Sequence, residues 1–220
     1  MAGPAIVEPD TPPGPASPEG PRIAVVIPCY RVTRSIGAVV DGIGDWAWGI
    51  WCVDDACPDG SAATIEALDD PRVHLVRRAQ NGGVGAATMT GYQAAIAAGA
   101  DTLVKLVGDG QMNADLVPAM VRPIVRGDAD YVKGNRFFSA ERVAAMPALA
   151  LVGSAGRSFL SKLSSGYWHL YDPTNELTAL EATVAAALPF DKVHPGDFFE
   201  SDLLFRLGVL SARVVEVPAP

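Results

Sequence analysis

The chain is poor in charged residues and has no basic excess. Only 19% of its 220 residues are Asp, Glu, Lys or Arg, and its formal net charge is -8 at pH 7. Surfaces that bind nucleic acid usually present a basic face, so this balance argues against a nucleic-acid partner. It does not argue against smaller phosphate-bearing ligands, because local cationic side chains, backbone amides and a divalent cation can hold them.

Long apolar runs are also missing. No stretch approaches the ~18 consecutive apolar residues that a membrane span needs, and the longest apolar segment, 143–153, contains Pro147. Residues 1–21 hold seven of the 18 prolines and no basic residue, which predicts a disordered or extended leader and not a signal peptide. We therefore expect one folded domain over residues 22–220.

Cysteine and histidine are scarce. Cys29, Cys52 and Cys57 are odd in number, and no second pair or histidine cluster completes a zinc site. The three histidines are scattered along the chain. We expect buried, reduced thiols, which suit a cytoplasmic compartment.

What the chain does have is apolar residues, 49% of the total, in alternating strand and helix patterns. Strands are predicted at 23–28, 49–55, 72–78, 102–107, 131–135 and 212–218, and helices at 35–44, 61–70, 83–99, 114–127, 148–165 and 194–210. Apolar strands separated by helices predict an α/β fold with a mostly parallel central sheet flanked by helices.

Polar residues gather where the predicted strands end. The clusters are Pro28–Arg31, Asp54–Asp55, Arg78–Gly83 and Asp109. In open sheets of this kind ligands bind at the carboxyl ends of the strands, so four clusters at one edge favour a binding site there. For Asp59–Gly60 we prefer a plain turn.

Several of these patterns have two interpretations. The glycines from Gly83 to Gly85 precede a helix, as in a phosphate-binding turn, but they follow the third strand and lack the third glycine of a dinucleotide fingerprint. A dinucleotide-dependent dehydrogenase is therefore disfavoured. Arg136 follows a strand end, where it either binds an anion or is simply solvated. Glu200 and Asp202 are either ordinary first-turn helix acids or carboxylates at a pocket wall.

Seven motifs in order carry a family resemblance. They are "VVIPCYR", "CVDDACPDGS", "RRAQNGGVGAA", "KLVGDGQM", "VKGNRFF", "DPTNELTAL" and "FFESDLLFRL". Together, from about Ile23 to Arg206, they resemble family-2 inverting nucleotide-sugar glycosyltransferases, above all the polyprenyl-phosphate sugar transferases such as dolichyl-phosphate mannosyltransferase. The resemblance implies a Rossmann-like nucleotide-diphosphate-sugar transferase fold with Mg or Mn bridging the diphosphate of the donor.

The resemblance also implies roles for individual residues. The residues implied around the donor nucleotide are Pro28, Tyr30, Asp54, Asp55, Asn81, Gly83 and Asp109. Asp109 and Gln111 would hold the metal, because Asp109 matches the last acid of the family's D-x-D motif.

On the acceptor side, Arg136, Arg157 and Lys133 would hold the phosphate of a polyprenyl phosphate. A hydroxyl acceptor would instead need a base, for which Asp202 or Glu200 is the candidate. A lipid acceptor implies association with the membrane surface at the cytoplasmic face.

The chain departs from the family pattern at several positions. Val107 stands where the first acid of D-x-D is expected, Glu176 stands where glycine is common, and Ala56–Cys57 replaces Gly-Ser. Val107 predicts a weaker metal site and leaves open a nucleotide-sugar-binding domain that has lost catalysis. Relatives often continue into a segment that approaches or spans the membrane, so we expect either a soluble member or a shortened chain.

Overall fold

The computed structural model describes residues 20–110, 112–136, 162–163, 165–172 and 175–219. Its centre is a sheet of seven strands in the order β3-β2-β1-β4-β6-β5-β7. The strands are β1 (Ile23–Cys29), β2 (Gly49–Asp54), β3 (Val73–Arg77), β4 (Thr102–Lys105), β5 (Tyr131–Asn135), β6 (Thr178–Glu181) and β7 (Val214–Pro218). The helices are α1 (Ile36–Asp41), α2 (Ser61–Glu66), α3 (Val84–Ala98), α4 (Val117–Val125), α7 (Ala182–Ala186) and α8 (Phe199–Val209), with short 3-10 turns η1 (Ala114–Leu116) and η3 (Phe190–Lys192).

The predicted α/β class and mostly parallel sheet are confirmed. Strands β1 to β4 run parallel to one another, and β7 is parallel to β5. The exception is β6, which is antiparallel to both β4 and β5. This reversed strand was not predicted, because the segment around 171–180 shows no long apolar run of the kind that marks a buried parallel strand.

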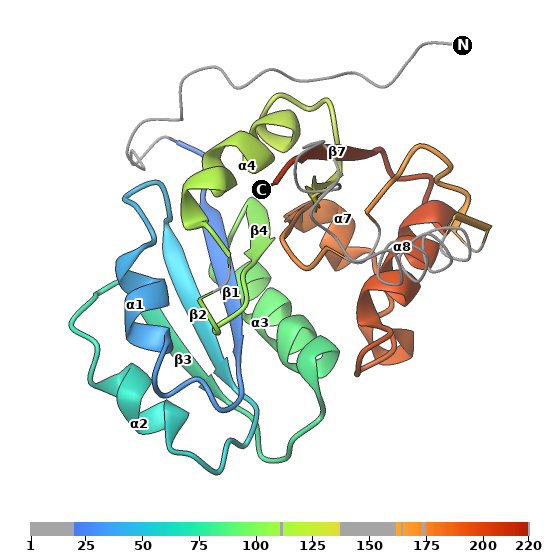
Figure 1. The fold of residues 1–220 in the computed structure, drawn as a ribbon. Helices are drawn as coiled ribbons and strands as arrows, with labels where there is room; N and C mark the ends of the chain where they lie inside the picture. The colour runs from blue at the N-terminus through green and yellow to red at the C-terminus, as the bar shows by residue number, and fades with distance from the viewer. Residues whose placement is uncertain (1–19, 111, 137–161, 164, 173–174, 220) are drawn as a thin grey trace, which may run out of the picture.

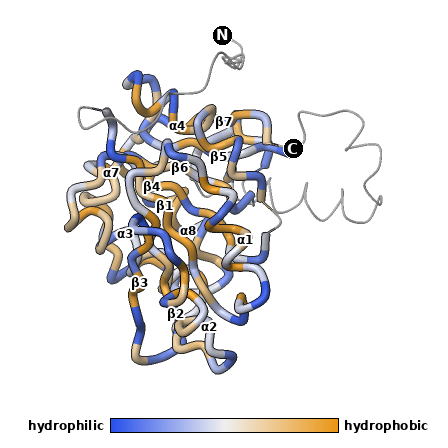
Figure 2. Tube along the Cα trace, turned by 90° about the vertical axis from the view of Figure 1, so that its left-hand side faces the viewer, coloured by the Kyte–Doolittle hydropathy of each residue, from blue (hydrophilic) through white to orange (hydrophobic). Residues whose placement is uncertain are grey.

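Helices cover both faces of the sheet because successive strand residues point to opposite sides. In β1, Ile23, Val25 and Ile27 face the core under α1, α2 and α4. Ala24 and Val26 face the other core, under α3, α7 and α8. Figure 1 shows α3 on one side of the strands and α1 with α2 on the other, and Figure 2 shows apolar residues concentrated along the central strands.

Element boundaries agree with the sequence in most places. Helix α3 ends as predicted at Gly99, whose φ of 97° is the left-handed conformation that glycine tolerates best. Helix α2 begins at Ser61 as predicted but ends at Glu66, before the predicted end at Asp70, and Gly60 (φ 83°) is its N-cap, a place for which the Ser61 side chain was also a candidate. The carboxylate of Asp59 accepts from the Ser61 amide at 3.1 Å, which confirms the predicted turn at Asp59–Gly60.

Other sequence expectations can be placed only in part. Most of the predicted helix at 148–165 and most of the leader lie outside the described residues. All three cysteines are free; Cys29 and Cys52 are buried as expected, whereas Cys57 is half-buried. Within the part of the chain that the structure describes, no helix has the length and apolar character needed to cross a membrane.

Candidate functional site

A pocket of about 350 Å³ opens at the carboxyl ends of β1, β2 and β4. The structure brings six of the seven predicted donor residues to its wall, and these are Pro28, Tyr30, Asp55, Asn81, Gly83 and Asp109. They lie at the ends of four strands or in the loops that follow them, so only the parallel arrangement of the strands makes them neighbours. We refer to this cavity as the donor pocket.

Asp55 organises one wall of the donor pocket. Its buried carboxylate forms an ion pair with Arg78 and accepts hydrogen bonds from the amides of Gly82, at 3.1 Å, and Gly83, at 2.9 Å. Asn81 adds a bond to the Gly83 amide at 3.2 Å. Gly83 has a φ of 88°, so this glycine turn is first of all a structural element that Asp55 holds against the pocket.

Asp54 is the predicted donor residue that the pocket leaves out. It ends β2 with only 7% of its surface exposed, and its backbone oxygen accepts from the Arg78 amide at 2.9 Å. Its Oδ1 is buried and makes no hydrogen bond to any residue that the structure describes. The adjacent pair of acids is therefore divided, with Asp55 facing the pocket and Asp54 lying behind it.

The turn after β2 is hydrogen-bonded to the loop after β1, and both lie at the donor pocket. Ala56 has a φ of 51°, in the left-handed region. The Cys57 sulfur accepts from the Arg31 amide at 2.9 Å, and its thiol donates to the Asp59 carboxylate at 2.7 Å. Hydrogen bonds from Cys57, and then from Ser61, hold the pKa of Asp59 well below its ordinary value. Sequence reasoning did not assign Cys57 this linking role.

The second glycine of the Gly83–Gly85 pair serves close packing. A Cβ atom on Gly85 would lie 2.6 Å from the Cβ of Phe199 and 2.8 Å from the Pro195 carbonyl oxygen. The next amide, Ala86, donates to that same carbonyl at 2.8 Å. The first turn of α3 is thus pressed against the start of α8, and this contact sets two pockets side by side.

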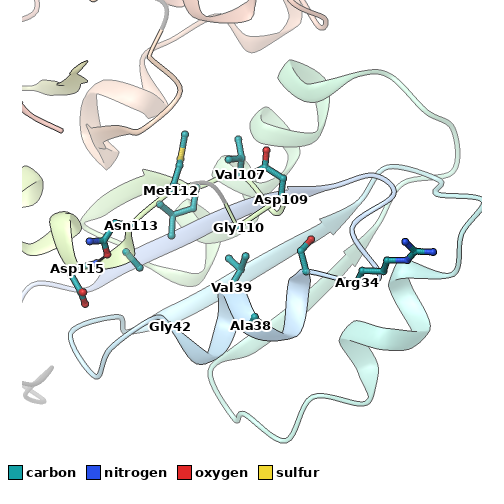
Figure 3. A pocket seen from close by; sticks show the side chains of 13 residues that line it. Arg34, Ala38, Val39, Gly42, Val107, Asp109, Gly110, Met112, Asn113 and Asp115 are labelled. Atoms are coloured by element: carbon teal, nitrogen blue, oxygen red, sulfur yellow. Dashed lines mark hydrogen bonds between the residues drawn. The ribbon is translucent and has the colours of Figure 1, made fainter. Parts of the chain in front are cut away.

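Asp109 follows β4 and stands between the donor pocket and a second cavity of about 510 Å³ beside α1. Figure 3 shows Asp109 and Asp115 along one side of this second cavity, and Arg34, Ala38 and Val39 along the other. The Ser35 hydroxyl donates to the Gly108 carbonyl at 2.5 Å, which fixes the loop that carries Asp109. The Asp115 amide donates to the Asn113 side chain at 2.9 Å, so Asn113 caps the turn η1 and Asp115 is an acid of its first turn.

The donors available to a metal near Asp109 are few. Mg and Mn favour oxygen ligands, and the side chain of Val107, two residues before Asp109, supplies none. Gln111, the other predicted ligand, lies outside the described residues. No group of three or more His, Cys, Asp and Glu side chains suited to a metal ion occurs in the described ranges. In the part of the chain that the structure describes, Asp109 is therefore the one carboxylate considered for the metal ion. The remaining ligands of the ion would come from other groups, such as Gln111, the donor diphosphate or water.

The two predicted catalytic acids have different surroundings. Glu200 forms an ion pair with Lys105 and lines a third cavity of about 270 Å³, which we call the α8 pocket. Asp202 accepts from the His194 amide at 2.7 Å and pairs with Arg206 at 3.2 Å. Asp202 therefore anchors the loop before α8, and Glu200 is the acid that faces a cavity.

The predicted acceptor-phosphate residues are also unlike one another. Arg136 binds Asp172 through its Nε at 2.8 Å and its Nη2 at 2.9 Å, and its side chain is 44% exposed. Lys133 is fully buried, and its ammonium donates to the Asn175 carbonyl at 2.7 Å. Burial lowers the pKa of Lys133 to about 8. Arg157 lies outside the described residues. Of the three, we carry forward Arg136 as the exposed cation.

The site and the sheet define the class before any relative is considered. A mostly parallel sheet with a pocket of polar loops at its carboxyl edge is the architecture of nucleotide-binding α/β proteins. Solved structures of glucosyl-3-phosphoglycerate synthase from Mycobacterium tuberculosis have this fold. The complex of that enzyme with Mn2+, uridine diphosphate and phosphoglyceric acid matches 90% of this chain and 69% of the other, with a TM-score of 0.65 and 21% identity. The likeness establishes a nucleotide-sugar transferase fold.

Sequence comparison then places the chain within one family. Residues 24–167 match the model of glycosyl transferase family 2, and the protein belongs to this family. The predicted family resemblance is thereby confirmed.

Curated relatives cover much of the chain. Undecaprenyl-phosphate mannosyltransferase of Micrococcus luteus is 28% identical over 90% of this chain and 82% of its own length. Polyprenol monophosphomannose synthase of Mycolicibacterium smegmatis is 29% identical over 90% and 76%. A UDP-N-acetylglucosamine–dolichyl-phosphate N-acetylglucosaminyltransferase of Methanococcus voltae is 30% identical over 66% and 64%.

Proposed function

We propose that this protein is an inverting glycosyltransferase that moves a sugar from a nucleotide-diphosphate donor to a polyprenyl phosphate. The observation that carries the proposal is the donor pocket, with Asp109 at its edge, next to the α8 pocket; Val84 lines both. The names of the relatives support the lipid acceptor, since each includes undecaprenyl phosphate, polyprenol monophosphomannose or dolichyl phosphate.

In this proposal the donor nucleotide binds between the ends of β1 and β3. Tyr30, whose surface is 43% exposed, offers a ring face for the base, and Asn81 offers an amide for polar contacts. Asp55 contributes mainly by holding the turn of Gly82 and Gly83 in place. The nucleotide is thus bound by a wall whose shape depends on buried hydrogen bonds.

A divalent cation, Mg or Mn, fits the proposed chemistry and would be held by Asp109 together with Gln111. When bound, such an ion neutralises charge that develops on the departing nucleoside diphosphate. Because Val107 offers no oxygen, we expect this chain to hold the ion more weakly than a site with two carboxylates. The two glycines beside Asp109 serve the loop itself: a Cβ atom on Gly108 would lie 3.0 Å from the Val32 side chain, and Gly110 has a φ of 81°.

Transfer needs a nucleophile on the face of the sugar opposite the diphosphate. An oxygen of the acceptor phosphate forms a bond to the anomeric carbon while the bond from that carbon to the diphosphate breaks, which inverts the centre. A phosphate is already an anion at neutral pH and requires no general base. Of the two candidate bases, Asp202 is held by the His194 amide and Arg206, and one oxygen of Glu200 is held by Lys105. The preference for a phosphate over a hydroxyl acceptor rests on the names of the relatives.

The acceptor is a membrane lipid, so the proposal places the enzyme at the cytoplasmic face of the membrane. We assign the phosphate to Arg136, which follows β5, because Asp172 orients its guanidinium by two bonds and the side chain is still 44% exposed.

A panel of UDP- and GDP-linked sugars with Mg or Mn, read first by thermal shift, tests the donor side of the proposal. The best binder is then supplied as a radiolabelled donor with polyprenyl phosphate in detergent. We expect label in the organic phase, and at least about tenfold less with Arg136→Ala. Arg126→Ala, an exposed arginine at the end of α4, is the matched control. Binding without turnover would instead support the impaired binding domain that Val107 suggests.

A further inference from the structure

A row of charged side chains lies inside the core beside the α8 pocket. Lys105 on β4 and Lys133 on β5 both pair in register with Thr178 on the central strand β6. Directly opposed residues of antiparallel strands point to the same face of the sheet, so the three side chains form one row. The preceding row on that face is apolar and contains Leu103, Leu180 and Tyr131. Two lysines thus replace apolar residues where the strands reach the pocket.

Burying these ammonium groups costs free energy, and that cost must be compensated by partners or explained by a function. The Lys105 side chain is only 1% exposed and Lys133 is fully buried. An ion taken out of water loses several kcal/mol of hydration, in order of magnitude, unless partners replace the water. Lys105 has Glu200 as its close partner, and Glu176 lies 4.0 Å away. Buried charged groups held by specific partners are often found at functional sites.

The two lysines support the two sides of the α8 pocket. Lys105 holds Glu200 at the start of α8. Lys133 donates to the carbonyl of Asn175, at 2.7 Å, and so supports the segment that carries Glu176. Glu176 and Glu200 both line the pocket. Neither lysine has a part in the proposed transfer step, yet both stabilise residues that a ligand in this pocket would touch.

The chemistry of the α8 pocket selects a ligand that donates hydrogen bonds. Its charged lining consists of one ammonium, Lys105, and three carboxylates, Glu176, Asp197 and Glu200. A phosphate would meet a net negative wall, whereas hydroxyl groups would meet several acceptors. Glu200 also has one buried oxygen, Oε2, with no hydrogen-bond partner among the described residues. That oxygen is closed off from solvent, and the buried hydroxyls of Tyr92 and Tyr131 also lack partners among the described residues. The Glu200 carboxylate therefore meets the cavity through the part of its side chain that is 12% exposed.

We propose that Lys105 is a positioning residue that orients the Glu200 carboxylate to accept a hydrogen bond from a hydroxyl of the transferred sugar. This inference rests on the proposed function and assigns to Glu200 sugar recognition in place of base catalysis. Val84, which lines both pockets, puts the α8 pocket next to the donor pocket, where the sugar of a bound donor would extend.

Monodeoxy donors, one for each hydroxyl of the sugar, test the inference. GDP-mannose and UDP-glucose, with their monodeoxy analogues, are the probes. In the wild type we expect one analogue to lose about 10- to 100-fold in kcat/KM, as for a hydrogen bond to a charged group. In the variants Glu200→Gln and Lys105→Met, the loss of kcat/KM for that same analogue, relative to the complete donor, should fall below about threefold. The double variant should lose little beyond either single change, because the two residues act as a unit.

Control measurements separate this role from a merely structural one. Glu176→Gln changes a half-exposed acid of the same pocket and should keep the wild-type deoxy penalty. Binding of GDP or UDP without a sugar should be unchanged in every variant, and a thermal melt confirms folding. Turnover of the complete donor by the wild type tests the proposed function independently of the role of Lys105 and Glu200. If no donor turns over, competition binding of intact and deoxy donors provides the same comparison. The inference is overturned if Lys105→Met and Glu200→Gln retain the full penalty, or if no hydroxyl of either sugar matters in the wild type.

Discussion

Ala56→Gly is expected to stabilise the protein, although it removes a methyl group. Ala56 has a φ of 51°, a conformation that costs an L-residue roughly 1–2 kcal/mol and costs glycine almost nothing. The residue is half-buried, so its methyl contributes little packing. Glycine also increases the entropy of the unfolded chain, which offsets roughly 0.4–1 kcal/mol of this stabilisation. The net gain should be about 0.5–1 kcal/mol.

The assay is urea unfolding, with a thermal melt as a second measure. For a chain of this size the gain corresponds to a melting temperature higher by about 1–4 °C. Ala63→Gly is the matched control, because the same change in the exposed interior of α2 should destabilise by about 1 kcal/mol. If Ala56→Gly destabilises as much as Ala63→Gly, the left-handed turn between Asp55 and Cys57 is not as described.

Three further predictions concern the thiol, the buried lysine and the metal. Under native conditions maleimide should label Cys57 alone, and Cys57→Ser should abolish labelling while leaving the free energy of unfolding within about 1 kcal/mol; labelling of a buried cysteine would contradict this. Because the pKa of Lys133 is lowered to about 8 from 10.5, the unfolded chain binds more protons between these values. As the pH rises through that window, the free energy of unfolding of the wild type should increase relative to that of Lys133→Met by up to roughly 1 kcal/mol per pH unit. Parallel curves of stability against pH for the two proteins would refute this prediction. Val107→Asp should lower the Mn concentration for half-maximal activity by about tenfold and Asp109→Asn should abolish metal stimulation, whereas unchanged metal titrations would remove Asp109 from the metal site.

The sequence predicted those features that depend on local patterns. Apolar strands alternating with helices specify the class of fold, because each element must bury its own apolar face. The clusters at the strand ends could be placed at one edge because parallel strands end together. The pocket at Tyr30, Asn81 and Asp109 follows from that rule alone.

Features that depend on contacts between distant segments could not be predicted in the same way. The reversed direction of β6 depends on pairing with β4 and β5, from which it is separated by at least 40 residues. The different surroundings of Glu200 and Asp202 depend on Lys105 and the loop at His194. One signal was nevertheless present, since Lys105 is a lone charge inside the apolar run "TLVKLV". A charge at such a position needs a buried partner, and Glu200 is that partner.

The most direct test of the proposed function compares two acceptors that differ only in the phosphate group. The purified chain receives radiolabelled donor, Mn, and either polyprenyl phosphate or the corresponding polyprenol in the same detergent. The account predicts label in the organic phase with polyprenyl phosphate and background label with polyprenol. Equal transfer to the two lipids, or transfer only to a water-soluble hydroxyl acceptor, would contradict it.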